Sequence, residues 1–342
     1  MRGIVLTALA LAISFPCAPI PPVFAQDDAP PPSRDAGLPN PYHVQNDWMK
    51  WPAGRPKIGG VADVAMDRDG KTVWYFERCG NTDDGCAINK TLDPILHFDA
   101  DGNLLKSFGA GMFVDPHGIF VDGNDNVWVV DSISKSHIVG DTVREFSKDG
   151  KLLRTIGTEG SKGDGPYEFN GASDVLVAPD GSIFVADGHD PGSNGRVVKY
   201  DRSGKFILQF GQRGPGPTDF NPPHGLAMDK EGRLYVADRS NKAVKIFDQE
   251  GHLMQVWPQF GMPSGVFVDK NDMLYVADSL SSDKSNPGFK PGIRIGSVKD
   301  GKVVAYIPWP EFNTIEGVTV ADDGTIYAGF TNVPGQHRFL KN

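Results

Sequence analysis

One strand-turn-strand pattern recurs six times along this 342-residue chain. Each copy reads as an apolar strand, a turn rich in Asp, Asn and Gly, and a second apolar strand, as in GIFVDGNDNVWVVDS and GLAMDKEGRLYVADRS. The copies begin at Asp63, Gly118, Asp174, Gly225, Gly265 and Gly317. Such units are too small to bury their own apolar faces, so each copy needs neighbouring copies beside it.

Further strand pairs follow several copies, for example VVKYDRSGKFILQFG, so each unit is expected to hold four short strands. Alternating apolar residues and Asp-Gly turns indicate antiparallel hairpins. Four-stranded units repeated at this period are typical of a β-propeller. The sequence therefore predicts an all-β, six-bladed β-propeller with four-stranded antiparallel blades over residues 46–342, with an all-β sandwich as the alternative.

The first 45 residues differ in composition from the repeats. Residues 1–25 carry Arg2, an apolar stretch and a Val-Phe-Ala ending, which is the pattern of a secretory signal peptide cleaved near Ala25. We therefore expect a secreted or periplasmic protein. Residues 26–45 are rich in proline and are predicted to form a disordered leader. No segment approaches eighteen consecutive apolar residues, so no membrane span is expected.

Charge and cysteine content narrow the possible partners and the compartment. The formal net charge of −9 argues against nucleic acid and anionic membranes as partners. Cys79 and Cys86 are the cysteines outside the predicted signal peptide. Their spacing does not match a paired CxxC metal site, and an oxidising compartment would permit a disulfide between them.

The position immediately before each repeat is expected to line the central channel, because the first strand of every propeller blade faces the axis. The residues there are Ala62, His117, Ser173, His224, Ser264 and Glu316. Alternate blades thus contribute His117, His224 and Glu316, and these three side chains should converge. Two imidazoles and a carboxylate are a ligand set for catalytic zinc, although other divalent ions also use it. The sequence predicts a metal site in this ring.

A second ring is expected where the next strand of each blade ends, after a recurring Val-Ala-Asp pattern. The recurring Asp is most simply a residue that caps the strand ends. Arg78 and Arg239 occupy this ring in opposite blades and do not recur. Two guanidinium groups near a metal would bind a substrate carboxylate, whereas the alternative is surface arginines paired with neighbouring acids.

Five stretches carry a resemblance to a known family. They are WPAGRPKIGGVADVAMDRDG with YFERCG, DPHGIFVDGNDNVWVVD, SDVLVAPDGSIFVADGH, FNPPHGLAMDKEGRLYVADR and FNTIEGVTVADDGTIYAG. With these, the chain resembles the NHL-repeat propellers and, within them, the peptidyl-α-hydroxyglycine α-amidating lyases. The resemblance implies cleavage of a C–N bond in a hydroxyglycine-type substrate. It also implies zinc at His117 and His224, and active-site roles for Arg78 and Arg239.

Three positions depart from the resembled family. Glu316 stands where the family has its third zinc-binding histidine, and His189 stands where the family has an active-site tyrosine. We expect Glu316 to bind the metal and His189 to act as a catalytic base, with a solvated loop histidine as the alternative. Gly317 replaces an Asp that helps the family to hold a structural calcium, so that calcium site would lack one ligand.

Three classes of function are compatible with these residues. The first is a metal-dependent lyase acting on a small-molecule or peptide-derived substrate that bears a carboxylate. The second is a lactonase or other hydrolase of propeller type, which would centre a calcium on oxygen ligands rather than on histidines. The third is a non-catalytic NHL-repeat binding protein, because the same scaffold serves many unrelated functions.

Overall fold

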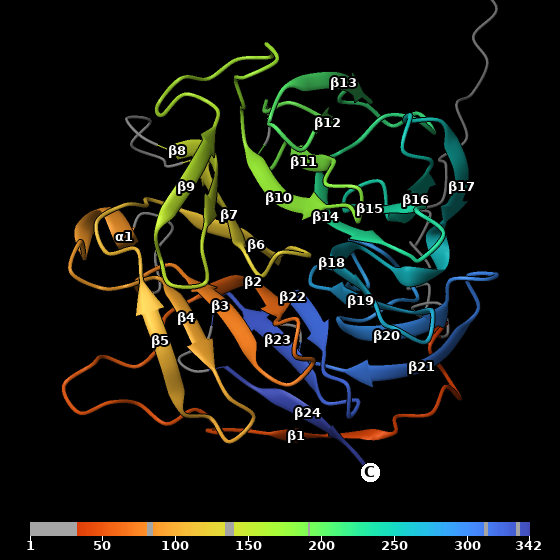
Figure 1. Ribbon diagram of the computed structural model, residues 1–342. Coiled ribbons are helices and arrows are strands. Elements are labelled where there is room, and N and C mark those ends of the chain that lie inside the picture. The colour runs from red at the N-terminus through yellow and green to blue at the C-terminus, as the bar shows by residue number, and fades with distance from the viewer. Residues whose placement is uncertain (1–32, 81–84, 134–139, 191, 311–313, 333–335) are drawn as a thin grey trace, which may run out of the picture. The chain divides into compact units, whose positions relative to one another are not determined.

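The computed structural model describes residues 33–80, 85–133, 140–190, 192–310, 314–332 and 336–342 (Figure 1). These residues form six antiparallel sheets of four strands each, which confirms the predicted six-bladed propeller. The predicted signal peptide lies outside the described residues. Regular helix in the described part is limited to α1 (Gly85–Ile88) and the 3-10 turn η1 (Pro258–Phe260). None of its helices has the length and apolar character needed to cross a membrane.

The first three blades follow the chain in order. Blade 1 comprises β2 (Val61–Met66), β3 (Val73–Glu77), β4 (Ile95–Phe98) and β5 (Leu104–Phe108). Blade 2 comprises β6 (Pro116–Val121), β7 (Val127–Ile133), β8 (Gly140–Phe146) and β9 (Leu152–Ile156). Blade 3 comprises β10 (Ala172–Val177), β11 (Ile183–Asp187), β12 (Arg196–Tyr200) and β13 (Phe206–Phe210).

The remaining blades repeat this order until the chain closes the ring. Blade 4 comprises β14 (Pro223–Met228), β15 (Leu234–Asp238), β16 (Ala243–Phe247) and β17 (Leu253–Trp257). Blade 5 comprises β18 (Pro263–Val268), β19 (Met273–Asp278), β20 (Gly292–Ser297) and β21 (Val303–Pro308). Blade 6 comprises β22 (Ile315–Val320), β23 (Ile326–Phe330), β24 (Arg338–Lys341) and β1 (Tyr42–Gln45). The first strand of each blade contains the start of one sequence repeat and lies near the centre of Figure 1.

Blade 6 is built from both ends of the described chain. Strand β1 pairs antiparallel with β24, with Tyr42 opposite Lys341 and Gln45 opposite Arg338. The propeller therefore begins at Tyr42 and not at residue 46. This pairing supplies the outermost strand of the last blade, which the C-terminal repeat lacks.

The expectation of a disordered leader is wrong for residues 33–45. The Asp35 carboxylate accepts hydrogen bonds from Nε and Nη2 of the fully buried Arg294, at 2.9 and 2.7 Å. The Arg34 N–H donates to the Gly288 carbonyl, and Tyr42 packs into the core shared by blades 5 and 6. The composition of this segment could not show its order, because the residues that hold it lie more than 200 positions later in the sequence.

A recurring Asp at the end of the second strand holds blades 2, 3 and 4 to the loops that enter them. Its carboxylate accepts a backbone N–H from that loop in three successive blades. The bonds run from Asp115 N to Asp131 (2.8 Å), from Asn170 N to Asp187 (2.9 Å) and from Asn221 N to Asp238 (2.6 Å). A cation on the third strand pairs with the same carboxylate, as Arg196 does with Asp187 at 2.8 Å. The predicted capping role of this Asp is confirmed.

Small residues allow the first strands to approach one another closely at the axis. A Cβ atom added at Gly265 would lie 2.2 Å from the carbonyl oxygen of Glu316 in the next blade. At Gly317 it would lie 2.6 Å from the Cα atom of Asp63. Real Cβ contacts are never this short, so glycine at these positions keeps the ring of preceding residues narrow.

A cavity of about 850 Å³ runs along the first strands. One end is lined by the ring that the sequence predicted, namely Ala62, His117, Ser173, His224, Ser264 and Glu316. The other end is lined by the turns between the first and second strands, including Arg68, Asn124 and Lys270. The ring residues therefore do line the central channel.

Candidate metal and active site

Two histidines of the ring are buried and oriented by backbone carbonyls. His117 on β6 donates from Nδ1 to the Ser173 carbonyl at 2.6 Å, and His224 on β14 donates from Nδ1 to the Ser264 carbonyl at 3.1 Å. A carbonyl oxygen can only accept, so Nδ1 carries the proton and Nε2 carries a lone pair. The small residues of blades 3 and 5 thus serve to orient the imidazoles of blades 2 and 4.

Both imidazoles are held in the neutral form that binds metals. Burial lowers the pKa of His117 well below its usual value, and His189 and Arg78 lower it further. Burial also lowers the pKa of His224, with Arg239 as the next cause. The Nε2 atoms of both rings are buried and have no hydrogen-bond partner among the described residues. Such neutral rings need not lose a proton before they bind a cation.

His189 joins these two histidines from the loop that follows β11. One ring nitrogen from each of His117, His189 and His224 lies within 4.8 Å of the others. The ring centroid of His189 is 4.6 Å from that of His117 and 5.2 Å from that of His224. The side chain of His189 is only 20% exposed, so it is not the solvated loop histidine of the alternative interpretation.

The predicted metal ligands are therefore only partly brought together. Glu316 on β22 lines the same ring, but it is not a member of the three-residue group. Its Oε1 atom accepts from Nη1 of Arg239 at 3.3 Å, and its Oε2 atom is buried without a partner among the described residues. The structure thus brings His189, the predicted base, into the group of possible ligand atoms, whereas Glu316, the predicted third ligand, is not in that group.

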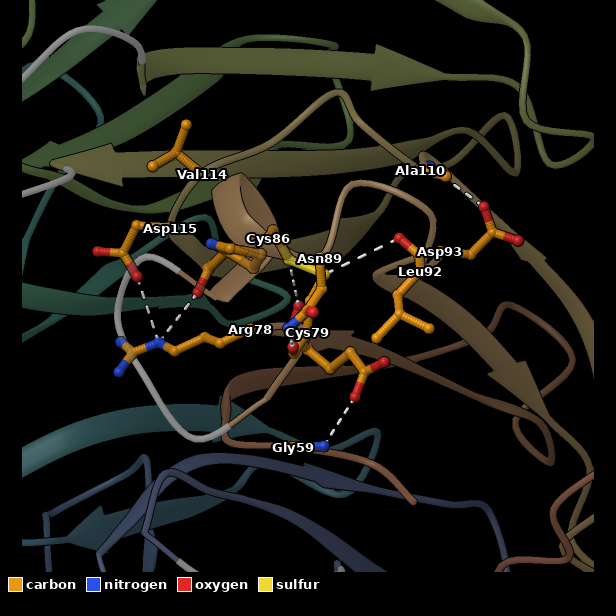
Figure 2. The surroundings of a disulfide bond; sticks show 12 residues. Gly59, Arg78, Cys79, Cys86, Asn89, Leu92, Asp93, Ala110, Val114 and Asp115 are labelled. Atoms are coloured by element: carbon orange, nitrogen blue, oxygen red, sulfur yellow. Dashed lines mark hydrogen bonds and ion pairs between the residues drawn. A yellow bond between two sulfur atoms is a disulfide. The ribbon is translucent and has the colours of Figure 1, made fainter. Parts of the chain in front are cut away.

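Both predicted arginines lie close to this ring. Arg239 follows β15, and its ion pair with Glu316 joins the second ring to the first. Arg78 follows β3, and its Nε atom lies 3.3 Å from Oδ1 of Asp115 and donates to the Pro116 carbonyl at 3.4 Å (Figure 2). The two rings therefore share one end of the propeller.

Asp115 was not predicted as part of the site. It precedes His117 by two residues in the DPH text, and its buried side chain pairs with Arg78. Its position in the sequence could have identified it, because side chains two residues apart in an extended segment point to the same side, and His117 is a ring residue. Its pairing fixes the direction of the Arg78 guanidinium group.

The predicted disulfide is confirmed. Cys79 and Cys86 are bonded, and Cys79 directly follows Arg78 (Figure 2). The Asn89 side chain donates to the Cys79 carbonyl at 2.8 Å, and the Arg78 N–H donates to the Gly60 carbonyl at 2.8 Å. The bridge and these hydrogen bonds hold the backbone from which Arg78 extends.

Two acids lie close to glycines at the axis, Asp63 beside Gly317 and Asp174 beside Gly118. Asp63 accepts from the Ile119 N–H at 3.1 Å, and Asp174 accepts from the Leu226 N–H at 2.7 Å. Enclosure by protein raises the pKa of Asp63 to about 7, and burial and the nearby Asp63 raise the pKa of Asp174. A calcium ion requires six or more oxygen ligands, and Gly317 contributes no side-chain oxygen. A structural calcium at these acids stays a prediction.

Comparison with known proteins supports the resemblance seen in the sequence. A family model for the NHL repeat matches residues 220–247. NHL repeat-containing protein 3 of Mus musculus is 35% identical over 216 residues, which is 61% of this chain and 58% of that protein. Peptidyl-alpha-hydroxyglycine alpha-amidating lyase 1 of Drosophila melanogaster is 32% identical over 237 residues, which is 62% of this chain and 41% of that protein. The chain thus spans less than two thirds of these relatives.

Solved structures with low sequence identity share the fold. A gluconolactonase from Xanthomonas campestris matches with a TM-score of 0.60 at 18% identity and covers 92% of this chain and 96% of its own. A streptogramin B lyase matches with a TM-score of 0.56 at 14% identity and covers 88% of this chain and 98% of its own. At these identities the matches support the propeller fold alone.

Proposed function

Because the chain is an NHL-repeat six-bladed propeller similar in sequence to the peptidyl-α-hydroxyglycine α-amidating lyases, we propose that it is a secreted, metal-dependent lyase. It would cleave the C–N bond of a hydroxyglycine-type or related small carboxylate substrate. Support for secretion comes from the disulfide, because such bridges persist in oxidising compartments.

One observation carries the proposal. The buried His117 and His224 and the partly buried His189 have buried Nε2 atoms without described partners, and one ring nitrogen of each lies within 4.8 Å of the others. Zinc accepts three imidazole nitrogens and keeps a fourth position open for substrate or water, whereas calcium prefers oxygen ligands. Zinc is therefore the ion that fits this set best. When bound, it would supply Lewis acidity toward a substrate oxygen.

The surrounding charges suit a small anionic substrate. Arg78 and Arg239 present two largely buried guanidinium groups near the histidines, and guanidinium groups bind carboxylates bidentately. Asp115 and Glu316 each pair with one of these arginines and so fix its direction. The substrate carboxylate would be held between the arginines, which places the adjacent carbon near the histidine ring.

The bond cleavage requires a proton acceptor. The substrate hydroxyl loses its proton, the O–H electron pair forms the C=O bond of glyoxylate, and the C–N electron pair leaves with nitrogen. The nitrogen then takes a proton to give the amide. Oε2 of Glu316 would accept the hydroxyl proton, and Nε2 of His189 would be the acceptor only in a site where it does not bind the metal.

The test is metal analysis combined with a glyoxylate assay on the purified mature protein. We expect about one zinc per chain, and glyoxylate release from an N-acyl-α-hydroxyglycine that stops on chelation and returns with zinc. His117→Ala and His224→Ala should lose the metal and stay folded, because the blades supply the core. Arg78→Ala should keep the metal and lower turnover by about 10²–10³.

A second candidate is a non-catalytic NHL-repeat binding protein. It is favoured by the mouse relative with 35% identity, whose name states no activity. Protein that binds no zinc and releases no glyoxylate would support this candidate against the lyase. Zinc binding without activity on hydroxyglycine substrates, combined with hydrolysis of lactones, would instead support the hydrolase alternative, for which the shared fold is the present argument.

A further inference from the structure

We propose that His189 is the third protein ligand of the metal and that Glu316, paired with Arg239, stays outside the ligand set. This inference rests on the metal dependence in the proposed function. It reverses the assignment expected from the sequence, in which Glu316 binds the metal and His189 acts as the base. Four observations support it, and each concerns the contacts of these side chains.

The first observation is the distance between the ligand atoms. The ring nitrogens of His117, His189 and His224 all lie within 4.8 Å of one another. Tetrahedral zinc with bonds near 2.05 Å holds its nitrogens about 3.4 Å apart. The nitrogens would need to approach one another by at most about 1.4 Å to reach that spacing. His189 lies on a loop after β11, so this adjustment does not require a strand to move.

The second observation is the chemistry of the three facing atoms. Each Nδ1 has an acceptor, which leaves every Nε2 as an acceptor without a described partner. A water molecule has two protons and cannot donate to three acceptors. Protonating one ring would place a third positive charge beside Arg78 and Arg239 in a buried region. A bound cation satisfies all three lone pairs at once.

The third observation is that His189 is oriented in the same way as the two ring histidines. Its Nδ1 lies 2.9 Å from Oδ1 of Asp190, as the other two rings lie against the carbonyls of Ser173 and Ser264. Ligating histidines nearly always donate their second nitrogen to a carboxylate or a carbonyl, which fixes the tautomer and the ring plane. All three residues of the group carry this feature.

The fourth observation concerns Glu316. Its Oε1 atom pairs with Nη1 of Arg239, and both side chains are about one tenth exposed. To bind the metal through this oxygen, the carboxylate would have to leave a buried guanidinium group, which would then lack its partner. Outside the ligand set, Glu316 keeps Arg239 in place and leaves Oε2 available as the proton acceptor.

The experiment compares zinc affinity between two variants by competition with a chromophoric chelator. His189→Ala should weaken zinc binding by at least 100-fold, whereas Glu316→Gln should change it by less than about fivefold. His252→Ala is the matched control, because His252 is 78% exposed and lies away from the ring register. Thermal melting of each apoprotein shows whether a loss of zinc reflects unfolding.

A second measurement uses the unsubstituted protein, so its result does not depend on whether the variants fold. X-ray absorption of the zinc-loaded protein should show scattering from three imidazoles, and Glu316→Gln should leave that signal unchanged. Two imidazoles in the parent, or loss of zinc from Glu316→Gln with retention by His189→Ala, would overturn the inference. If the parent binds zinc but releases no glyoxylate, the lyase proposal fails and these measurements still decide the ligands. If the parent binds no zinc, both fail.

Discussion

Asp63→Asn should stabilise the propeller at pH 8 much more than at pH 5. Asp63 stands at the wall of the axial cavity and is enclosed by protein, which raises the pKa of its carboxyl from the usual 3.8 to about 7. The negative charge of Glu316 adds to this effect, and the N–H groups of Ile119 and Val64 oppose it. Asparagine keeps an oxygen that accepts from Ile119 and carries no charge at any pH.

The sign and size follow from the difference in proton binding. The folded chain binds the Asp63 proton more tightly than the unfolded chain, so this stabilisation is complete below about pH 4 and is lost as the pH rises through 7. A shift of about 3 units corresponds to roughly 4 kcal/mol at most, and cavity water would reduce it. At pH 5, which is about one unit above the pKa of the unfolded chain, the part of this stabilisation that corresponds to one pKa unit is already lost. The advantage of the variant should therefore grow by roughly 2–3 kcal/mol between pH 5 and pH 8.

Urea denaturation of parent and variant at both pH values, with a calcium chelator present, measures this growth. Groups that titrate equally in both proteins cancel in the comparison. Asp149→Asn is the control, because Asp149 is exposed and Lys106 lowers its pKa, so its effect should be equal at pH 5 and pH 8. Growth below about 0.5 kcal/mol for Asp63→Asn would refute the reasoning. If calcium stabilises the parent at pH 8 but not the variant, the structural calcium binds at this carboxylate.

Three further changes test features that support the site. Asp35→Ala removes one of two carboxylates from the buried Arg294 and should lower the free energy of unfolding by about 3 kcal/mol in urea titrations. Replacing Cys79 and Cys86 by serine opens a short loop and should cost about 2.4 kcal/mol, while mass spectrometry of the parent should detect neither thiol as free. Gly265→Ala should lower the melting temperature markedly, because its Cβ would lie 2.2 Å from a carbonyl oxygen of the next blade.

The sequence was sufficient to predict the blades because their determinants are local and repeated. Hairpin turns and alternating apolar residues recur at matching places in all six sheets, and the Asp at the end of the second strand recurs in four of them. Strand β1 could not be predicted in this way. Tyr42–Gln45 follows a proline-rich stretch, and it becomes a strand only because β24, nearly 300 residues later, presents an open edge. Ring closure is a property of the assembled blades and not of any one segment.

The candidate site was predictable to the extent that it follows the repeat register. His117, His224 and Glu316 could be placed because they precede equivalent strands, and all three line the channel. His189 lies in the loop after β11, which has no counterpart of equal length in the other blades. The direction of a side chain on such a loop depends on contacts such as the one with Asp190, and the repeat pattern carries no information about them.

Positions 189 and 316 both depart from the resembled family, and the two departures are chemically consistent if His189 binds the metal and Glu316 accepts the proton. A change at position 316 alone would leave two imidazoles at the channel mouth, and a change at position 189 alone would leave four. Together they preserve three, which is the number that zinc binds while keeping one position open. The carboxylate gained at position 316 is held by Arg239 instead of remaining an unpaired buried charge, which would be costly. Restoring histidine at position 316 alone should therefore release Arg239 from its partner and bring a fourth imidazole to the ring.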